Sequence, residues 1–105
     1  MTEKELQDTI RAALNQLPGV RFWRNNCGFA SAERVVYGLA VGSGDLIGLI
    51  DGRFVSLEIK TPRGRVRPEQ ETWRRVIDAL GGIARIVRSV DDALAVVDEV
   101  RRASS

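Results

Sequence analysis

An Asp-Gly pair in the middle of the chain constrains the fold more than any other feature. Asp51-Gly52 lies between two apolar, β-prone runs within residues 45–60. Both central residues of a type I′ turn need positive φ, and Asp-Gly accepts that conformation, so the pair is a strong hairpin signal. We therefore predict an antiparallel hairpin over residues 45–60. Pairing its two strands would bring Asp45 and Glu58 close together near the open end.

Apolar periodicity and turn residues predict the elements on either side of this hairpin. Pro68 suits the first turn of a helix whose apolar stripe is Trp73, Val76, Ile77 and Leu80. The order indicates an α/β fold, a mixed central sheet flanked by helices. The expected elements are a helix over 3–17, a strand over 20–24, a loop over 29–34, an extended segment over 35–41, a helix over 68–80, a strand over 83–87 and a helix over 91–102.

The size and composition of the chain are those of one globular domain. It has 105 residues, of which 44% are hydrophobic and 29% charged, so we treat residues 1–105 as a single domain. No run of about 18 apolar residues occurs and the N-terminus is charged and polar, which excludes a membrane span and a secretory signal. We expect an intracellular, cytoplasmic protein without a membrane partner.

The chain contains no histidine and only one cysteine, Cys27. Histidine and cysteine are the usual zinc ligands, and histidine is the usual base of a serine triad, so both kinds of site are excluded. Any metal must then be held by oxygen atoms, which favours Mg²⁺ or Mn²⁺.

Asp45, Glu58 and Lys60 form the strongest candidate site. On a strand, Glu58 and Lys60 share one face while Ile59 points to the other. Two carboxylates could hold a divalent cation that acts on a phosphate, with Lys60 stabilising the developing charge. The alternative is a surface ion pair between Glu58 and Lys60 beside a turn aspartate.

Arginine-rich segments surround this candidate site. Of the 16 lysines and arginines, 14 are arginine, although the net charge is only +2. The planar guanidinium suits phosphate oxygens, so a basic cluster beside an acidic site indicates a nucleic-acid enzyme. The members of the cluster between positions 60 and 75 are Lys60, Arg63, Arg65, Arg67, Arg74 and Arg75.

These motifs together resemble the PD-(D/E)XK nucleases, and more narrowly the stand-alone VRR-NUC proteins of phages and bacteria. The resemblance implies a restriction-endonuclease-like αβββαβ core, dependence on Mg²⁺ or Mn²⁺, a metal-binding carbonyl from Ile59 and activity on branched DNA. It rests on Glu3-Lys-Glu-Leu-Gln7, Phe22-Trp-Arg-Asn-Asn-Cys-Gly28, Gly44-Asp-Leu46, Glu58-Ile-Lys-Thr-Pro-Arg-Gly64, Pro68-Glu-Gln70 and Val87-Arg-Ser89, which together span nearly the whole chain.

The resemblance also implies supporting residues for the site. A glutamine at the position of Gln70 supports the lysine or the attacking water in similar nucleases. An acid on the first helix often completes such sites as a metal ligand. Glu3 fits the family spacing better than Glu5, and two residues apart on a helix they cannot both face the site.

Several arginines are candidates for contacts with nucleic acid. Arg63, Arg65 and Arg67 follow the catalytic strand directly, and a solvated loop is the alternative for them. Arg24, with the neighbouring Asn25 and Asn26, and Arg88 are further candidates.

Two positions depart from the family pattern. Gly44 stands where the family has a proline before the first acid, a change that we expect to cost little. Ser89 stands where the second arginine of the Val-Arg-Arg signature belongs, so any role of that arginine is in doubt here.

We therefore expect a metal-dependent endonuclease, with four-way (Holliday) junctions in DNA as the leading substrate. A single small domain offers one active site, so cutting both strands of a symmetric junction calls for a homodimer. The alternatives are a nicking or flap nuclease of the same fold and a catalytically silent DNA-binding module.

Overall fold

The computed structural model describes residues 1–26, 28–30, 35–37, 39–40 and 42–104, with only the backbone described for 28–30 and 35–37. No helix in the described part of the chain is long and apolar enough to span a membrane. The elements are α1 (Glu3–Leu14), β1 (Val20–Arg24), β2 (Gly28–Ala30), β3 (Val35–Tyr37), β4 (Leu46–Ile50), β5 (Arg53–Ile59), α2 (Pro68–Ala79), β6 (Ile83–Val87) and α3 (Val90–Ala103).

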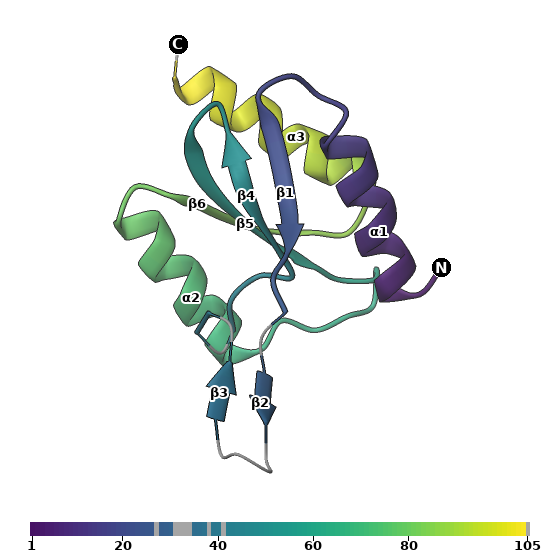
Figure 1. Ribbon diagram of the computed structural model, residues 1–105, viewed down its shortest axis with the longest axis vertical. Coiled ribbons are helices and arrows are strands. Elements are labelled where there is room, and N and C mark those ends of the chain that lie inside the picture. The colour runs from purple at the N-terminus through teal and green to yellow at the C-terminus, as the bar shows by residue number, and fades with distance from the viewer. Residues whose placement is uncertain (27, 31–34, 38, 41, 105) are drawn as a thin grey trace.

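A four-stranded mixed sheet in the order β1-β4-β5-β6 forms the centre of the molecule (Figure 1). β1 and β5 each pair antiparallel with β4, whereas β6 runs parallel to β5. The predicted hairpin is β4–β5, and its turn residues Asp51 and Gly52 have φ values of 50° and 85°. The predicted αβββαβ order is therefore confirmed as α1, β1, β4, β5, α2 and β6.

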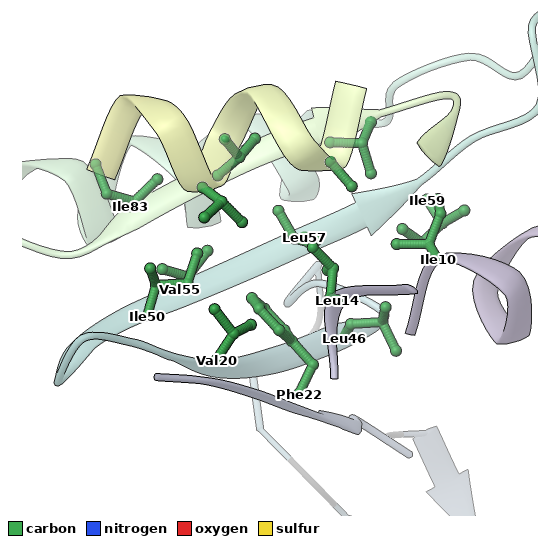
Figure 2. Close-up of a cluster of buried hydrophobic side chains, with 14 of the residues drawn as sticks. Ile10, Leu14, Val20, Phe22, Leu46, Ile50, Val55, Leu57, Ile59 and Ile83 are labelled. Carbon is green, nitrogen blue, oxygen red and sulfur yellow. The ribbon is translucent and has the colours of Figure 1, made fainter. Parts of the chain in front are cut away.

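Helices cover the two faces of this sheet differently. α1 and α3 pack against one face and against each other, while α2 lies along β6 on the opposite face. The hydrophobic core fills the space under α1 and α3, where Val55, Leu57 and Ile59 of β5 meet side chains such as Ile10 and Phe22 (Figure 2). All five side chains are almost completely buried.

The segment after β1 contains a strand pair that the sequence analysis only partly predicted. Residues 28–30, assigned partly to a loop, form β2, which pairs antiparallel with β3; the predicted extended segment over 35–41 is a strand only over 35–37. Each strand has only three residues, too few for an alternating pattern to be recognised. In Figure 1 this pair projects away from the main body, beyond the sheet. The predicted loop over 31–34 lies outside the described residues.

Two helices also differ from expectation. α1 ends at Leu14 rather than at residue 17, because Asn15 caps it and turns its amide toward Phe22 of β1. The apolar stripe of α2 is only partly covered: Trp73 and Ile77 are half-buried, and Leu80, just after the helix, is 81% exposed. Periodicity indicates which helix face is apolar, but not how much of it meets the sheet.

Candidate active site

The alternation of β5 sends polar side chains to the face of the sheet opposite the core. Three buried polar residues alternate with the core residues of β5. Ser56 and Glu58 lie on the strand, and Lys60 follows its last residue, Ile59. Because successive strand residues point to opposite faces, the three polar side chains share the face that α2 covers. The strand thus carries residues of the candidate site and residues of the core in alternate positions.

Asp45 is held across the open end of the hairpin. Its Oδ2 accepts a hydrogen bond of 2.8 Å from the backbone N–H of Ile59, and its backbone carbonyl accepts one of 2.8 Å from the N–H of Asn25. The predicted proximity of Asp45 to Glu58 therefore rests on a direct bond to the residue after Glu58.

The two carboxylate oxygens of Glu58 differ in their surroundings. Oε1 accepts a hydrogen bond of 2.6 Å from Nε2 of Gln70 and lies 3.7 Å from Nζ of Lys60. Oε2 is buried and has no hydrogen-bond partner among the described residues. A buried carboxylate oxygen without a partner costs free energy, so this atom calls for a partner such as a cation or a proton.

The electrostatics of the acidic pair point the same way. Burial, and next the negative charge of Asp45, raise the pKa of Glu58 to about 8, although Lys60 acts in the opposite direction. Burial also raises the pKa of Asp45, against the Ile59 N–H bond and a hydrogen bond with Glu58, which both lower it. The two carboxyl groups can form that hydrogen bond only when one of them carries a proton. The site therefore holds more negative charge than its own residues neutralise, and near neutral pH a proton or a cation compensates it.

Gln70 is oriented by the start of α2. Its Oε1 accepts a hydrogen bond of 2.8 Å from the backbone N–H of Arg67, the N-cap residue, while its Nε2 donates to Glu58. Each end of the amide thus has a partner, which fixes its orientation. The contact that the structure shows is with Glu58, while support of Lys60 or of the attacking water stays a prediction.

Glu3 lies nearer to the site than Glu5. Glu3 is half-buried, and its charge adds to the causes that raise the pKa of Glu58. Glu5 is exposed and accepts a hydrogen bond from the Thr2 hydroxyl. In the part of the chain that the structure describes, no three His, Cys, Asp or Glu side chains gather closely enough to hold a metal ion. The charge of Glu3 thus reaches the acidic pair, and its role as a metal ligand stays a prediction.

The candidate nucleic-acid residues fall into two groups. Arg24, Arg63, Arg65 and Arg67 are exposed, the last three on the segment that joins β5 to α2. Arg88 is half-buried, and its Nη1 donates to two backbone carbonyls of that segment, 2.6 Å to Thr61 and 2.9 Å to Gly64. Arg88 thus holds the arginine-bearing segment in place, a structural role that the sequence analysis did not anticipate.

Other residues next to the acidic pair were not predicted from the sequence. Ser56 and Trp73 hydrogen-bond to each other, and Asn25, expected to face nucleic acid, instead binds Gly44 through its side chain. For Ser56 a signal was present, since it lies two positions before Glu58 and so on the same face of the strand. Nothing local indicated the partners of Asn25 or Trp73.

A divalent cation fits the chemistry of this donor set. Two carboxylates, one with a buried oxygen lacking a partner, are oxygen ligands of the kind that Mg²⁺ and Mn²⁺ prefer. Mg²⁺ usually keeps several waters and takes only one or two protein carboxylates, so a third acidic ligand is not required.

Comparison with known proteins identifies the fold. No protein-family profile and no curated protein matches this chain. A solved structure described as "VRR_NUC domain protein" superimposes with a TM-score of 0.70 at 21% sequence identity, and the match covers 94% of this chain and 87% of that one. The chain therefore has the VRR-NUC, restriction-endonuclease-like fold that its motifs predicted.

Proposed function

We propose that this protein is a Mg²⁺- or Mn²⁺-dependent endodeoxyribonuclease that hydrolyses phosphodiester bonds. The observation that carries the proposal is Glu58 Oε2, a buried carboxylate oxygen with no partner in the described residues, in an acidic pair with Asp45. A carboxylate pair that served only stability would have its oxygens satisfied. The VRR-NUC fold supports the nuclease class.

The residues would divide the work as follows. Asp45, Glu58 and the carbonyl of Ile59 would hold the cation, which when bound supplies positive charge to the phosphate and acidifies water. Lys60, whose Nζ is 3.7 Å from Glu58, would stabilise negative charge developing on the phosphate. Gln70 would keep the Glu58 carboxylate in one orientation, because its amide bonds both Glu58 and the N-cap of α2.

Branched DNA, with four-way junctions first, is the substrate that we propose. The segment that follows β5 carries three exposed arginines, Arg63, Arg65 and Arg67, and it begins next to Glu58 and Lys60. A DNA backbone bound to these arginines would therefore lie near the acidic pair. Arginine suits such contacts because its planar fork matches phosphate oxygens. Symmetric cleavage of a junction needs two sites, so we propose that the working unit is a homodimer.

The test is cleavage of end-labelled four-way junction, flap, nicked and linear DNA with Mn²⁺, with Mg²⁺ and with EDTA. We expect cleavage that EDTA abolishes, with paired symmetric cuts in the junction. Glu58→Ala should abolish cleavage while DNA binding persists. Asp98→Asn, which removes an exposed acid on α3, is the matched control and should cut like wild type.

Each other outcome has a defined meaning. Full cleavage by Glu58→Ala with Mg²⁺ present would overturn the assignment of the site. Binding without cleavage in either metal would indicate a silent DNA-binding module. Cleavage of flaps or nicks in preference to junctions would support the nuclease activity but overturn the proposed substrate. A monomeric mass in solution under conditions of junction cleavage would overturn the proposed homodimer.

A further inference from the structure

Gly44, the residue before Asp45, is held through both of its backbone polar groups. The N–H of Gly44 donates a hydrogen bond of 3.1 Å to the hydroxyl of Ser56, and the carbonyl of Gly44 accepts one of 2.9 Å from Nδ2 of Asn25. There is no space for a side chain at this position, since a Cβ on Gly44 would collide with Ser56 Oγ and lie 2.7 Å from the Leu57 carbonyl.

Ser56 is itself fixed from the other side by α2. Ser56 is only 1% exposed, and its hydroxyl accepts a second hydrogen bond, of 2.9 Å, from the indole N–H of Trp73. The indole N–H and the peptide N–H are both donors only, so Ser56 must act as the acceptor for each. Removing the hydroxyl would therefore leave both donors without this partner.

Helix α2 and strand β5 meet through two matched pairs of polar side chains. Gln70 donates to Glu58, and Trp73 donates to Ser56. Residues three apart on a helix are neighbours on one face, about 5–6 Å apart, and residues two apart on a strand share a face at a comparable spacing. The same face of α2 therefore orients Glu58 through Gln70 and, through Trp73, the serine that accepts the hydrogen bond from the Gly44 N–H.

Asn25 holds the other side of the same segment. Its Nδ2 donates to Ser43 Oγ at 2.7 Å as well as to the Gly44 carbonyl, and its backbone N–H donates to the carbonyl of Asp45. Three consecutive residues before and at the first acid are thus bound by one asparagine at the end of β1.

We propose that Ser56 and Asn25 are positioning residues for Asp45. By holding the N–H and the carbonyl of Gly44, they set where the Asp45 carboxylate lies relative to the Ile59 N–H and to Glu58. For the reaction this rests on the proposed nuclease function, since a correctly placed Asp45 is what a cation shared with Glu58 requires.

The first test is hydrogen exchange of the Ile59 amide in metal-free protein, followed by NMR. This amide donates to Asp45 Oδ2, and neither Ser56 nor Asn25 is its bonding partner. We expect Ser56→Ala and Asn25→Ala to speed its exchange at least about 10-fold relative to core amides such as Val55. The matched control is Asn15→Ala, because Asn15 also binds backbone through its side-chain amide, but at Phe22 and at the opposite end of α1 from Glu3.

The second test is a Mn²⁺ titration by calorimetry on the same proteins. Loss of a group that orients a metal ligand typically weakens metal binding 10–100-fold. We therefore expect affinity to fall at least about 10-fold in Ser56→Ala and Asn25→Ala and to stay unchanged in Asn15→Ala. If Ser56→Ala does not fold, Asn25→Ala decides alone.

The two proposals fail in different ways. Ile59 exchange and Mn²⁺ affinity equal to those of Asn15→Ala would overturn the positioning role, and the nuclease would stand if wild type still cuts. A wild type that neither binds Mn²⁺ nor cuts DNA would overturn the proposed function. In that case the exchange rate of the Ile59 amide would still show whether Ser56 and Asn25 hold Asp45 in place.

Discussion

The two faces of β5 differ in chemistry although both are buried. Toward α1 and α3 the strand presents Val55, Leu57 and Ile59, whose partners are all apolar. Toward α2 it presents polar side chains that must each find a specific partner, and Glu58 Oε2 has none among the described residues. The apolar face thus supplies the stability that allows the polar face to hold an unfavourable arrangement of charges. Substitutions on the apolar face should therefore lower the free energy of unfolding, and substitutions at the acidic pair should lower the cleavage rate.

The largest expected effect is on catalysis at Glu58. Glu58→Gln keeps the shape of the side chain but removes the charge, and we expect the metal-dependent cleavage rate to fall on the order of 10²–10³-fold. Stability at pH 7.5 in EDTA should hold or rise, because glutamine is buried as a neutral group, whereas Glu58 must take up a proton on folding at that pH. Single-turnover cleavage and urea unfolding measure the two quantities. A variant that is both inactive and strongly destabilised would contradict this separation of faces.

The neighbouring residue should give the opposite result. Leu57→Ala opens a cavity under α1 and α3, since Leu57 is 1% exposed, and should cost about 2–5 kcal/mol of unfolding free energy. The folded fraction should still cleave DNA with unchanged metal dependence. Urea unfolding, with cleavage measured where the variant is folded, checks this; a loss below about 1 kcal/mol would mean that the core is not closely packed there.

Placing the family's proline at position 44 should break the contact between Gly44 and Ser56 and lower both stability and cleavage. Proline lacks the N–H that Ser56 accepts, and its ring would enter the space occupied by Ser56 Oγ. We expect Gly44→Pro to cost about 1–3 kcal/mol and to reduce cleavage. In a double-mutant cycle with Ser56→Ala, measured by urea unfolding, the two changes should be less than additive. Full additivity would mean that the two residues do not interact.

The acidic pair should also make metal-free stability depend on pH. The folded protein raises the pKa of Glu58 to about 8, whereas an unfolded glutamate titrates near 4.3. Between these values the folded state holds a proton that the unfolded state releases, so stability falls as pH rises from about 5 to about 8. Melting in EDTA at pH 5.5 and 8.0 tests this. Glu58→Gln should reduce the slope to the part that comes from the buried Asp45, and adding Mn²⁺ at pH 8.0 should restore stability.

The smallest effect is expected at the exposed end of α2. Leu80 is 81% exposed, so Leu80→Gln should change the free energy of unfolding by less than about 0.5 kcal/mol. Thermal unfolding at two protein concentrations checks it. A larger loss that depends on concentration would instead place Leu80 in a contact between subunits.

Features that depend on a few consecutive residues were predicted well. The β4–β5 hairpin followed from Asp51-Gly52, because only certain residues accept positive φ at both turn positions. The start of α2 followed from Pro68, whose missing N–H costs nothing in the first turn. With the turn fixed, the alternation of β5 placed Glu58 and Lys60 on one face and Ile59 on the other.

Features that depend on pairing between distant segments were not predicted. β2 and β3 are too short to carry a pattern of their own, and the partial exposure of α2 depends on what lies beneath it. The surroundings of Gly44 were not predicted either. Its N–H donates to Ser56 and a Cβ there would collide with Ser56 Oγ, so proline does not fit this position as it stands; that glycine costs little here stays a prediction.

The sequence by itself determined the order of the elements, the types of residue in the acidic pair and the strand face on which Glu58 lies. Turn and helix preferences and strand alternation act over a few residues, so they can be read locally. Only the tertiary structure decided that Gln70 binds Glu58, that Ser56 and Asn25 bind the backbone of Gly44, and that Glu58 Oε2 lacks a partner in the described residues. These contacts join residues 12 to 19 positions apart, and burial and hydrogen bonding at that range exist only once α2, β1 and the hairpin have packed together.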